Sequence, residues 1–351
     1  MPEDVWSEQD TTPSAVEEAF RRLLFERHAA DAAYAPARVL NLVVVVDREW
    51  RGEIANRLER VGRYHASRTI LCTVEPGRTT MDARVSMEYA DDPAPGAPAV
   101  MHEGAELRIG PQHLRALDTV VDPILVQGLI TMVWSPHGHD EAVDSLLRLS
   151  HVVLLDSVEE LDVRAALGRV EQLAQRVYIV DLAWLRSTPW RERVCATFDP
   201  PQWRGELRRI SGVTVRHRPE SLSSAALFCG WLASRLGWRA DALTYVRDHH
   251  EGRLRARHGA VAVRLEPNEQ QHVPGLAGVT IETASGMSIS LDRGPGGLSA
   301  RRVDPKGREW RWTVLGASRG ETGILGEGVR QALLRDPTYR PALDAAAAMV
   351  A

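Results

Sequence analysis

The residues best suited to chemistry lie in one segment, Asp-Leu-Ala-Trp-Leu-Arg-Ser-Thr-Pro-Trp-Arg at 181–191. Its candidate binding residues are Asp181, Trp184, Arg186, Thr188, Pro189, Trp190 and Arg191. Tryptophan and arginine dominate binding hot spots, and a guanidinium suits carboxylate or phosphate recognition. Because neither a nucleophile nor a set of metal ligands accompanies them, the pattern predicts recognition rather than catalysis. The same side chains also suit an aromatic cluster that joins two domains.

A second segment, His137-Gly138-His139-Asp140-Glu141, carries imidazole and carboxylate groups of the kind that bind zinc. It lacks the downstream histidine of an HxHxDH site, and it follows Trp134-Ser135-Pro136 as a polar stretch. We interpret it as a solvated loop that leads into a helix. The sequence therefore predicts neither a metal site nor catalytic residues.

Nucleotide-binding motifs are absent from the sequence. The apolar run at 39–47 is followed by Arg48-Glu49-Trp50-Arg51, which cannot form the tight glycine turn that holds a phosphate. Neither a Walker sequence nor a GxSxG nucleophile elbow occurs, so we predict no cofactor. Arg68, at the start of the next predicted strand, is able to hold a phosphate or a carboxylate, or to bond a neighbouring loop.

The elements that must position these residues alternate in the first part of the chain. Ser14 and Glu17 form a capping-box pattern, which predicts a helix from about residue 15 to 32. Further helices are predicted at 49–61, 112–126 and 140–149, and strands at 39–47, 68–74, 81–89, 99–109, 130–134 and 151–156, with a loop at 91–98. This alternation indicates a mostly parallel, Rossmann-like sheet in a three-layer α/β domain.

The second part changes character. Helices are predicted at 164–176, 221–236, 326–335 and 341–349, and strands at 212–217, 242–248, 257–266, 278–283, 287–292, 297–303 and 309–315. Thr188 is expected to cap a helix whose first residue is Pro189. The short strands indicate an antiparallel meander in an α+β domain. We expect a helical extension at 1–37, an α/β domain at 38–160 and an α+β domain at 161–351.

Composition narrows the classes of partner. A chain of 351 residues with a formal net charge of −4 lacks the basic footprint of a nucleic-acid-binding protein. The longest apolar run is too short to span a bilayer, so we expect a cytoplasmic protein without membrane contact. Cys72, Cys195 and Cys229 are far apart in the sequence, and we expect all three to be buried and reduced.

Several segments, taken in order, resemble one family. They are Arg38–Val44, His65–Ile70, Asp122–Leu125, Val133–Pro136, the pair Asp181–Trp184 and Thr188–Arg191, and Gly230–Gly237. The chain resembles the glucose-6-phosphate dehydrogenase assembly proteins known as OpcA. The family typically has proline at the position of Ala66 and tryptophan at the position of Ser135.

The resemblance implies a non-catalytic partner of glucose-6-phosphate dehydrogenase, the enzyme that opens the oxidative pentose phosphate pathway and makes NADPH. We expect an assembly factor or allosteric activator that binds through the 181–191 residues, with Arg68 as a second anchor. One rival hypothesis is a sugar-phosphate-binding protein or enzyme that uses the crevice of the first sheet, lined by Arg68, His137 and His139. Another is a structural subunit without regulatory effect.

Overall fold

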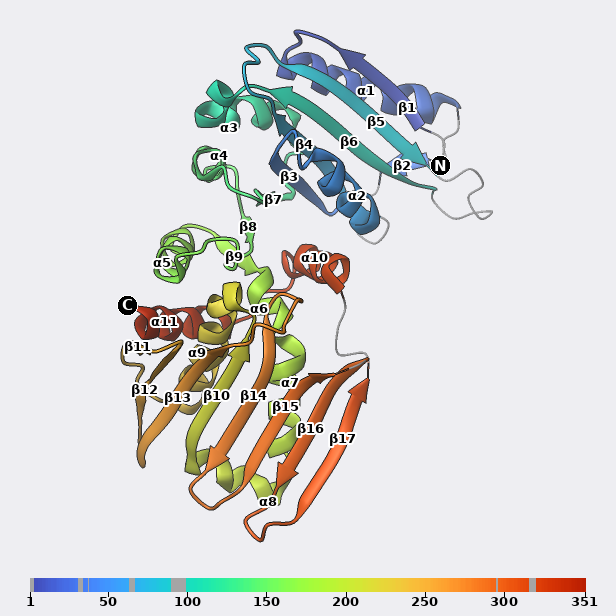
Figure 1. Ribbon diagram of the computed structural model, residues 1–351. Helices are drawn as coiled ribbons and strands as arrows, with labels where there is room; N and C mark the ends of the chain where they lie inside the picture. The colour runs from blue at the N-terminus through green and yellow to red at the C-terminus, as the bar shows by residue number, and fades with distance from the viewer. Residues whose placement is uncertain are drawn as a thin grey trace. The chain divides into compact units, whose positions relative to one another are not determined.

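The computed structural model describes residues 3–30, 34–36, 38–62, 67–89, 99–294, 296–315 and 320–351. The chain divides into two compact units (Figure 1). The first comprises Met1–Leu155, Arg176–Val180 and Leu325–Leu334, and the second Asp156–Gln175, Asp181–Ile324 and Arg335–Ala351. The domain limits expected at 37 and 160 stay a prediction. The loop expected at 91–98, and His65 and Ala66, lie outside the described residues.

A largely parallel sheet forms the first unit. Its strands are β1 (Glu3–Glu8), β2 (Tyr34–Pro36), β3 (Leu40–Asp47), β4 (Ser67–Val74), β5 (Asp82–Tyr89), β6 (Ala99–Ile109), β7 (Ile130–Trp134), β8 (Val152–Leu155) and β9 (Tyr178–Asp181). In the described part of the chain their order is β1-β5-β6-β4-β3-β7-β8-β9, with β2 beside β6. The chain leaves β3 for β4 on one side and later places β7 on the other. Strand order therefore reverses beside β3, as in doubly wound folds.

Helices lie on both faces of this sheet, as the predicted three-layer arrangement requires (Figure 1). The helices are α1 (Pro13–Ala30), α2 (Arg51–Gly62), α3 (Leu117–Val121) and α4 (Asp140–Leu146), with 3-10 turns η1 (Pro111–Ala116) and η2 (Asp122–Ile124). β3 is buried over almost its whole length because both of its faces are covered. The predicted helix at 112–126 is instead three short helical pieces, since Pro111 and Pro123 each begin a new turn.

The start of α1 corrects one prediction. The helix begins at Pro13, and Thr12 rather than Ser14 caps it, because the Ala15 N–H donates to the Thr12 hydroxyl at 3.3 Å. Glu17 therefore takes no part in a capping box with Ser14. Its carboxylate instead pairs with arginines, one of them far away in the sequence.

An eight-stranded sheet dominates the second unit. Its strands are β10 (Ile210–His217), β11 (Thr244–Val246), β12 (His249–Ala256), β13 (Gly259–Pro267), β14 (Leu276–Thr283), β15 (Ser288–Gly294), β16 (Gly297–Val303) and β17 (Glu309–Leu315). In the described residues the order is β11-β12-β13-β10-β14-β15-β16-β17. Strands β14 to β17 form the predicted antiparallel meander, whereas β10 runs parallel to β13. The predicted fold classes of both parts of the chain are confirmed.

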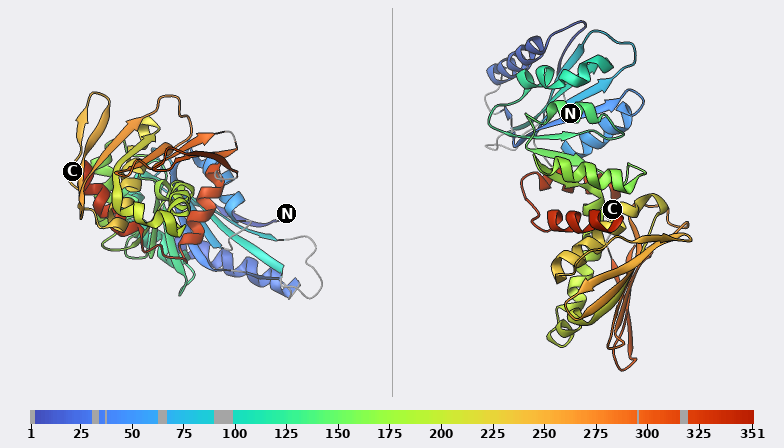
Figure 2. Two further views of the ribbon diagram at one scale, coloured as in Figure 1. Left: turned by 90° about the horizontal axis from the view of Figure 1, so that it is seen from below. Right: turned by 90° about the vertical axis from the view of Figure 1, so that its left-hand side faces the viewer.

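Helices cover one face of that sheet, as the side view in Figure 2 shows. The helices and turns from residue 163 onward are α5 (Val163–Leu173), α6 (Leu182–Arg186), α7 (Thr188–Phe198), α8 (Pro201–Arg204), η3 (Gly205–Arg209), η4 (Pro219–Ser221), α9 (Leu222–Leu236), α10 (Gly320–Gln331) and α11 (Tyr339–Val350). α9 packs on β10 and β13, and α11 packs on α9. Gly230 permits this packing, because a Cβ atom there would lie 2.2 Å from the Ala342 carbonyl oxygen. Among the described residues, no helix combines the length and the apolar character needed to cross a bilayer.

Candidate functional site

The 181–191 segment begins with a buried carboxylate. Asp181 ends β9 and caps α6, accepting hydrogen bonds from the backbone N–H groups of Ala183 at 2.9 Å and Ser157 at 3.1 Å. The Tyr339 hydroxyl donates to its other oxygen at 3.0 Å. Burial, reinforced by the charge of Asp156, raises the pKa of Asp181 to about 6. This carboxylate ties three distant stretches of the chain together within the second unit.

Trp184 lies in the interior of the same unit. Its side chain is 2% exposed, and its indole N–H donates to the Asp336 carboxylate at 2.9 Å. The Tyr339 ring meets it edge-on, with 5.4 Å between ring centroids. The Arg191 guanidinium lies 3.5 Å from the centroid of the indole, a cation–π contact. The ring is therefore held by contacts with Arg191 and Tyr339 and by a hydrogen bond from its only polar atom.

The two arginines of the segment are held by carboxylates and hydroxyls. Arg186 forms ion pairs with Asp156 and Glu321, each at 2.6 Å. Although burial lowers the pKa of Arg186, its interactions with the two carboxylates outweigh this and raise the pKa overall. Arg191 donates to the Ser187 and Thr188 hydroxyls at 3.1 and 2.9 Å. Burial lowers the pKa of Arg191 to about 10, which leaves the side chain charged at neutral pH.

The remaining members of the segment begin α7. The helix starts at Thr188 with Ser187 before it, one residue earlier than predicted, and Pro189 stands in the first turn as expected. Trp190 is 1% exposed, and Arg293 lies 5.9 Å from its ring centroid. Thr188 and Pro189 are half-buried. They mark where the segment approaches solvent in the described structure, since the side chains of Arg186 and Arg191 are only 8% and 11% exposed.

Burial changes the interpretation of the two tryptophans. The sequence pattern suggested exposed anchors for a partner, or else an internal aromatic cluster. The structure places the rings of Trp184 and Trp190 in the interior of the second unit. Sequence reasoning did not single out Asp336 and Tyr339, which complete the cluster but stand about 150 residues away along the chain. A partner contact by this segment stays a prediction.

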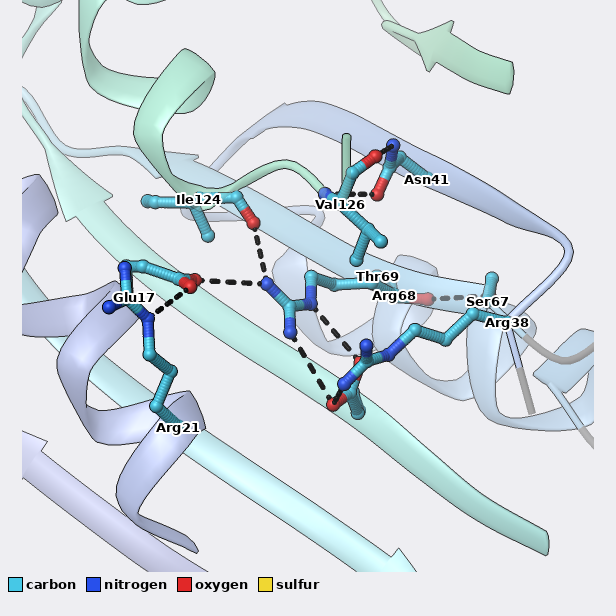
Figure 3. A network of polar contacts seen from close by, with 10 residues as sticks. Glu17, Arg21, Arg38, Asn41, Ser67, Arg68, Thr69, Ile124 and Val126 are labelled. Atoms are coloured by element: carbon cyan, nitrogen blue, oxygen red, sulfur yellow. Dashed lines mark hydrogen bonds and ion pairs between the residues drawn. The ribbon is translucent and has the colours of Figure 1, made fainter. Parts of the chain in front are cut away.

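Arg68 belongs to a polar network in the first unit (Figure 3). Arg68 as a whole is 4% exposed. Its side chain donates to both oxygens of Glu103, to Glu17 at 3.1 Å and to the Ile124 carbonyl oxygen at 2.9 Å. Its guanidinium carbon also lies 4.2 Å from the Phe20 ring centroid. These bonds join α1, β4, β6 and η2. The Arg68 guanidinium is thus bonded to groups of the chain itself, including the carboxylates of Glu103 and Glu17.

Glu103 also forms an ion pair with a second arginine in the same network. Arg38 donates to both of its carboxylate oxygens. Nearby, the Asn41 side chain donates to the Val126 carbonyl oxygen and accepts from the Val126 N–H, both at 3.0 Å (Figure 3). This pair fixes the segment that leads into β7.

The crevice hypothesis placed Arg68 together with His137 and His139, and this grouping is wrong. In the parallel register Arg68 pairs with Asn41 near the amino ends of β3 and β4. His137 and His139 follow β7, which is parallel to β3, and so lie beyond its carboxyl end. Side chains at opposite ends of parallel strands cannot line one crevice.

The histidine loop itself has a defined geometry. His137 and His139 adopt φ angles of 67° and 64°, in the left-handed region. The His137 ring stacks on Trp50 with 4.5 Å between centroids, and His139 Nε2 lies 3.2 Å from an Asp47 oxygen. The described residues contain no group of three or more His, Cys, Asp or Glu side chains placed to hold a metal ion.

A second region with tryptophan and arginine was not singled out from the sequence. Trp310 and Trp312 of β17 are each 37% exposed. The Arg302 guanidinium lies 4.7 Å from the Trp310 ring centroid and 4.9 Å from that of Trp203. The sequence did contain a sign of this region. Trp310-Arg311-Trp312 lies in a predicted strand, and alternate residues of a strand place their side chains on one face.

The cysteines agree with the sequence prediction only in part. Cys72 and Cys229 are buried, and burial raises the pKa of each thiol to about 12. Cys195 is exposed, which corrects the expectation that all three are buried. It lies on α7, on the side turned away from the packed face that carries Val194 and Phe198.

Together these features define a two-unit α/β protein in which arginine–carboxylate networks connect distant segments. A domain described as "Glucose-6-phosphate dehydrogenase subunit N-terminal domain" matches residues 58–172, and the corresponding "C-terminal domain" matches residues 177–343. The chain belongs to the OpcA family of glucose-6-phosphate dehydrogenase assembly proteins.

Three cyanobacterial proteins described as OxPP cycle protein OpcA are similar to parts of the chain. The protein of Synechococcus elongatus is 30% identical over 173 residues, covering 48% of this chain and 39% of the relative. That of Nostoc punctiforme is 31% identical over 130 residues, covering 36% and 28%. That of Synechocystis is 27% identical over 136 residues, covering 38% and 29%. The matched part thus spans well under half the length of each relative.

Proposed function

We propose that this chain is a non-catalytic assembly factor and allosteric activator of glucose-6-phosphate dehydrogenase. It acts in the cytoplasm and supports the oxidative pentose phosphate pathway and its supply of NADPH. One observation carries the proposal: two domains described as parts of a glucose-6-phosphate dehydrogenase subunit match in order over residues 58–172 and 177–343. The printed names of the cyanobacterial relatives support the same pathway.

The physical requirement for activation is differential binding. An activator must bind the active form of the dehydrogenase more tightly than the inactive form. A coupling free energy of about 1–3 kcal/mol changes substrate affinity by about 5–150-fold. A stable contact of this kind buries on the order of 1,200–2,000 Å² in total.

The 181–191 segment contributes to this contact in two ways. The half-buried Thr188 and Pro189, at the start of α7, touch the dehydrogenase, and the largely buried Arg191 supports them through its hydrogen bond to the Thr188 hydroxyl. The buried rings of Trp184 and Trp190 hold them in place. Asp181 and Arg186 fix the start of the segment, and Arg68 maintains the first unit through its internal network.

The test is a glucose 6-phosphate titration of the same organism's dehydrogenase, with and without the full chain. We expect a lower apparent KM or a higher plateau that saturates as the chain is added. If the chain co-purifies with the dehydrogenase but leaves its kinetics unchanged, the chain is a structural subunit and not an activator. Unchanged kinetics without a complex on a sizing column would overturn the proposal.

A variant of the segment sharpens this test. Pro189→Arg adds a long charged side chain at the solvent boundary and removes no backbone hydrogen bond, because proline has no N–H. We expect activation to fall by at least about tenfold in apparent affinity, with an unchanged melting temperature. Pro201→Arg is the matched control, since Pro201 is exposed and also begins a helix. Equal activation by the two variants would remove the segment from the interface.

A further inference from the structure

The first unit contains a cavity of about 540 Å³. Its lining includes Arg48, Arg51, Thr73, Arg84, Glu106 and Arg108. Neither Arg68 nor the His137–His139 loop belongs to this set. Small-molecule sites typically enclose about 300–1,000 Å³, so the space suits a metabolite.

The cavity lies at the carboxyl ends of parallel strands. Arg48 follows the last residue of β3, Thr73 is the second-last residue of β4, and Arg108 is the second-last of β6. These three strands run in the same direction. In open α/β sheets, ligands bind outside the carboxyl ends of the strands.

The register shows that one face of the sheet supplies the cavity. Thr73 pairs with Arg108, and Arg84 pairs with both Ser7 and Glu106. Directly paired residues point to the same side of a sheet. Arg51, in the first turn of α2, pairs with Glu106 and so places that helix start over the same face. The amide groups at a helix start add positive potential there.

Arginines and glutamates share the lining. Three of the four arginines have carboxylate partners: Arg51 pairs with Glu106, Arg84 with Glu3 and Arg108 with Asp82. Arg48 is exposed and has no ion pair within the part of the chain that is described. A guanidinium without a carboxylate is available to a phosphate oxygen.

Thr73 gives an independent sign of an absent ligand. Its side chain is 1% exposed, yet its hydroxyl finds no hydrogen-bond partner among the described residues. Burying a hydroxyl without a hydrogen-bond partner is unfavourable, because its lost hydration is not replaced. Because Thr73 lines the cavity, a ligand oxygen placed there would satisfy this group.

We propose that this cavity binds a small phosphate ester that also carries hydroxyl groups. Arg48 and the Thr73 hydroxyl hold the phosphate near the start of α2. Glu106, which lies on the same face as Arg84 and lines the cavity beside Arg51, is placed to accept a ligand hydroxyl. The site is separate from the 181–191 segment and does not rest on the proposed partner.

The test uses the full chain alone, titrated with glycerol 3-phosphate and with glycerol in a calorimeter at constant ionic strength. We expect saturable binding of glycerol 3-phosphate and none of glycerol. Arg48→Ala should weaken binding about tenfold, the usual effect of losing one charged hydrogen bond. Arg57→Ala is the control. It also removes one arginine charge, but Arg57 lies in α2 and does not line the cavity.

A second variant separates ligand binding from folding. Thr73→Val keeps the shape and removes the unsatisfied hydroxyl, so the melting temperature should stay equal or rise while binding falls several-fold. No saturable binding of glycerol 3-phosphate would overturn the proposal. So would an equal loss in Arg48→Ala and Arg57→Ala, which would show general charge attraction instead of a site. Since no dehydrogenase is present, the outcome does not depend on the proposed function.

Discussion

Two regions of the second unit carry the same residue types in different surroundings. The 181–191 segment and strand β17 each hold a pair of tryptophans with arginines close by. Trp184 and Trp190 are 2% and 1% exposed, whereas Trp310 and Trp312 are each 37% exposed. In both regions a guanidinium lies against an indole ring.

The difference comes from residues far away in the sequence. Asp336 receives the Trp184 indole N–H, and Tyr339 packs on the same ring. β17 is the last strand of its sheet in the described residues, so no further strand covers its outer edge there. Residue type therefore marks both regions as suited to recognition, while long-range packing decides which side chains are accessible.

Removing the buried ring is the strongest way to test this comparison. Trp184→Ala should lower the free energy of unfolding by about 3–5 kcal/mol, because it empties a core site and removes one of the hydrogen-bond donors of Asp336. Urea unfolding followed by circular dichroism measures the change. A loss below about 1 kcal/mol would show that the ring is not a core element and would restore it as a surface anchor.

Displacing the helix that covers the segment is the next test. In Gly230→Ala the new Cβ atom would lie 2.2 Å from the Ala342 carbonyl oxygen of α11, the helix that carries Tyr339. We expect a loss of about 2–3 kcal/mol in the free energy of unfolding. Gly168→Ala in α5 is the matched control, since nothing lies within 4 Å of its added Cβ atom. That variant should be slightly stabilised, because alanine favours the helix by about 1 kcal/mol.

Acid titration tests the buried carboxylate at the start of the segment. Burial raises the pKa of Asp181 from 3.8 to about 6, so the folded state binds this proton more tightly than the unfolded chain does. Its contribution to stability therefore falls as the pH rises from about 4 to about 6, and then levels off. Relative to the wild type, Asp181→Asn should gain about 3 kcal/mol across this window, because the pKa differs by about two units between the folded and unfolded states. Urea unfolding at several pH values measures it, and a constant difference would contradict the assignment.

The exposed ring gives the smallest expected effect. Trp312→Ala should lower the free energy of unfolding by less than about 1 kcal/mol, because the ring already contacts water and has little packing to lose. The same urea measurement as for Trp184→Ala gives a direct comparison. Equal losses in the two variants would mean that burial does not distinguish the two regions.

The sequence predicted most of the regular elements because their periodicity is local. β3 and β4 were predicted within one residue of their observed limits, and so was the short β7. β1, β2, β9 and β12 were not predicted. In β12 the run from His249 to Ala256 is mainly polar and contains Gly252, so it lacks the apolar alternation of a half-buried strand.

The candidate sites could be predicted only in part, because their geometry depends on pairing between distant segments. Arg68 was recognised as a residue that holds an anion, and it does hold carboxylates, but they are Glu103 and Glu17 of the chain itself. Its place near the amino end of β4 follows only from the strand register. Thr73 gave no signal in the sequence, since an unsatisfied hydroxyl is visible only once its neighbours are placed.

The position of β10 constrains how the second unit reaches its native state. This strand lies inside the sheet between β13 and β14, and both neighbours follow it by more than forty residues along the chain. During synthesis both of its edges therefore lack their native partners while α9, β11 and β12 are made, and one edge still lacks β14 after β13 has been made. Such non-local pairing slows folding and exposes strand edges to association with other chains. We expect refolding yield, more than equilibrium stability, to decline as protein concentration rises.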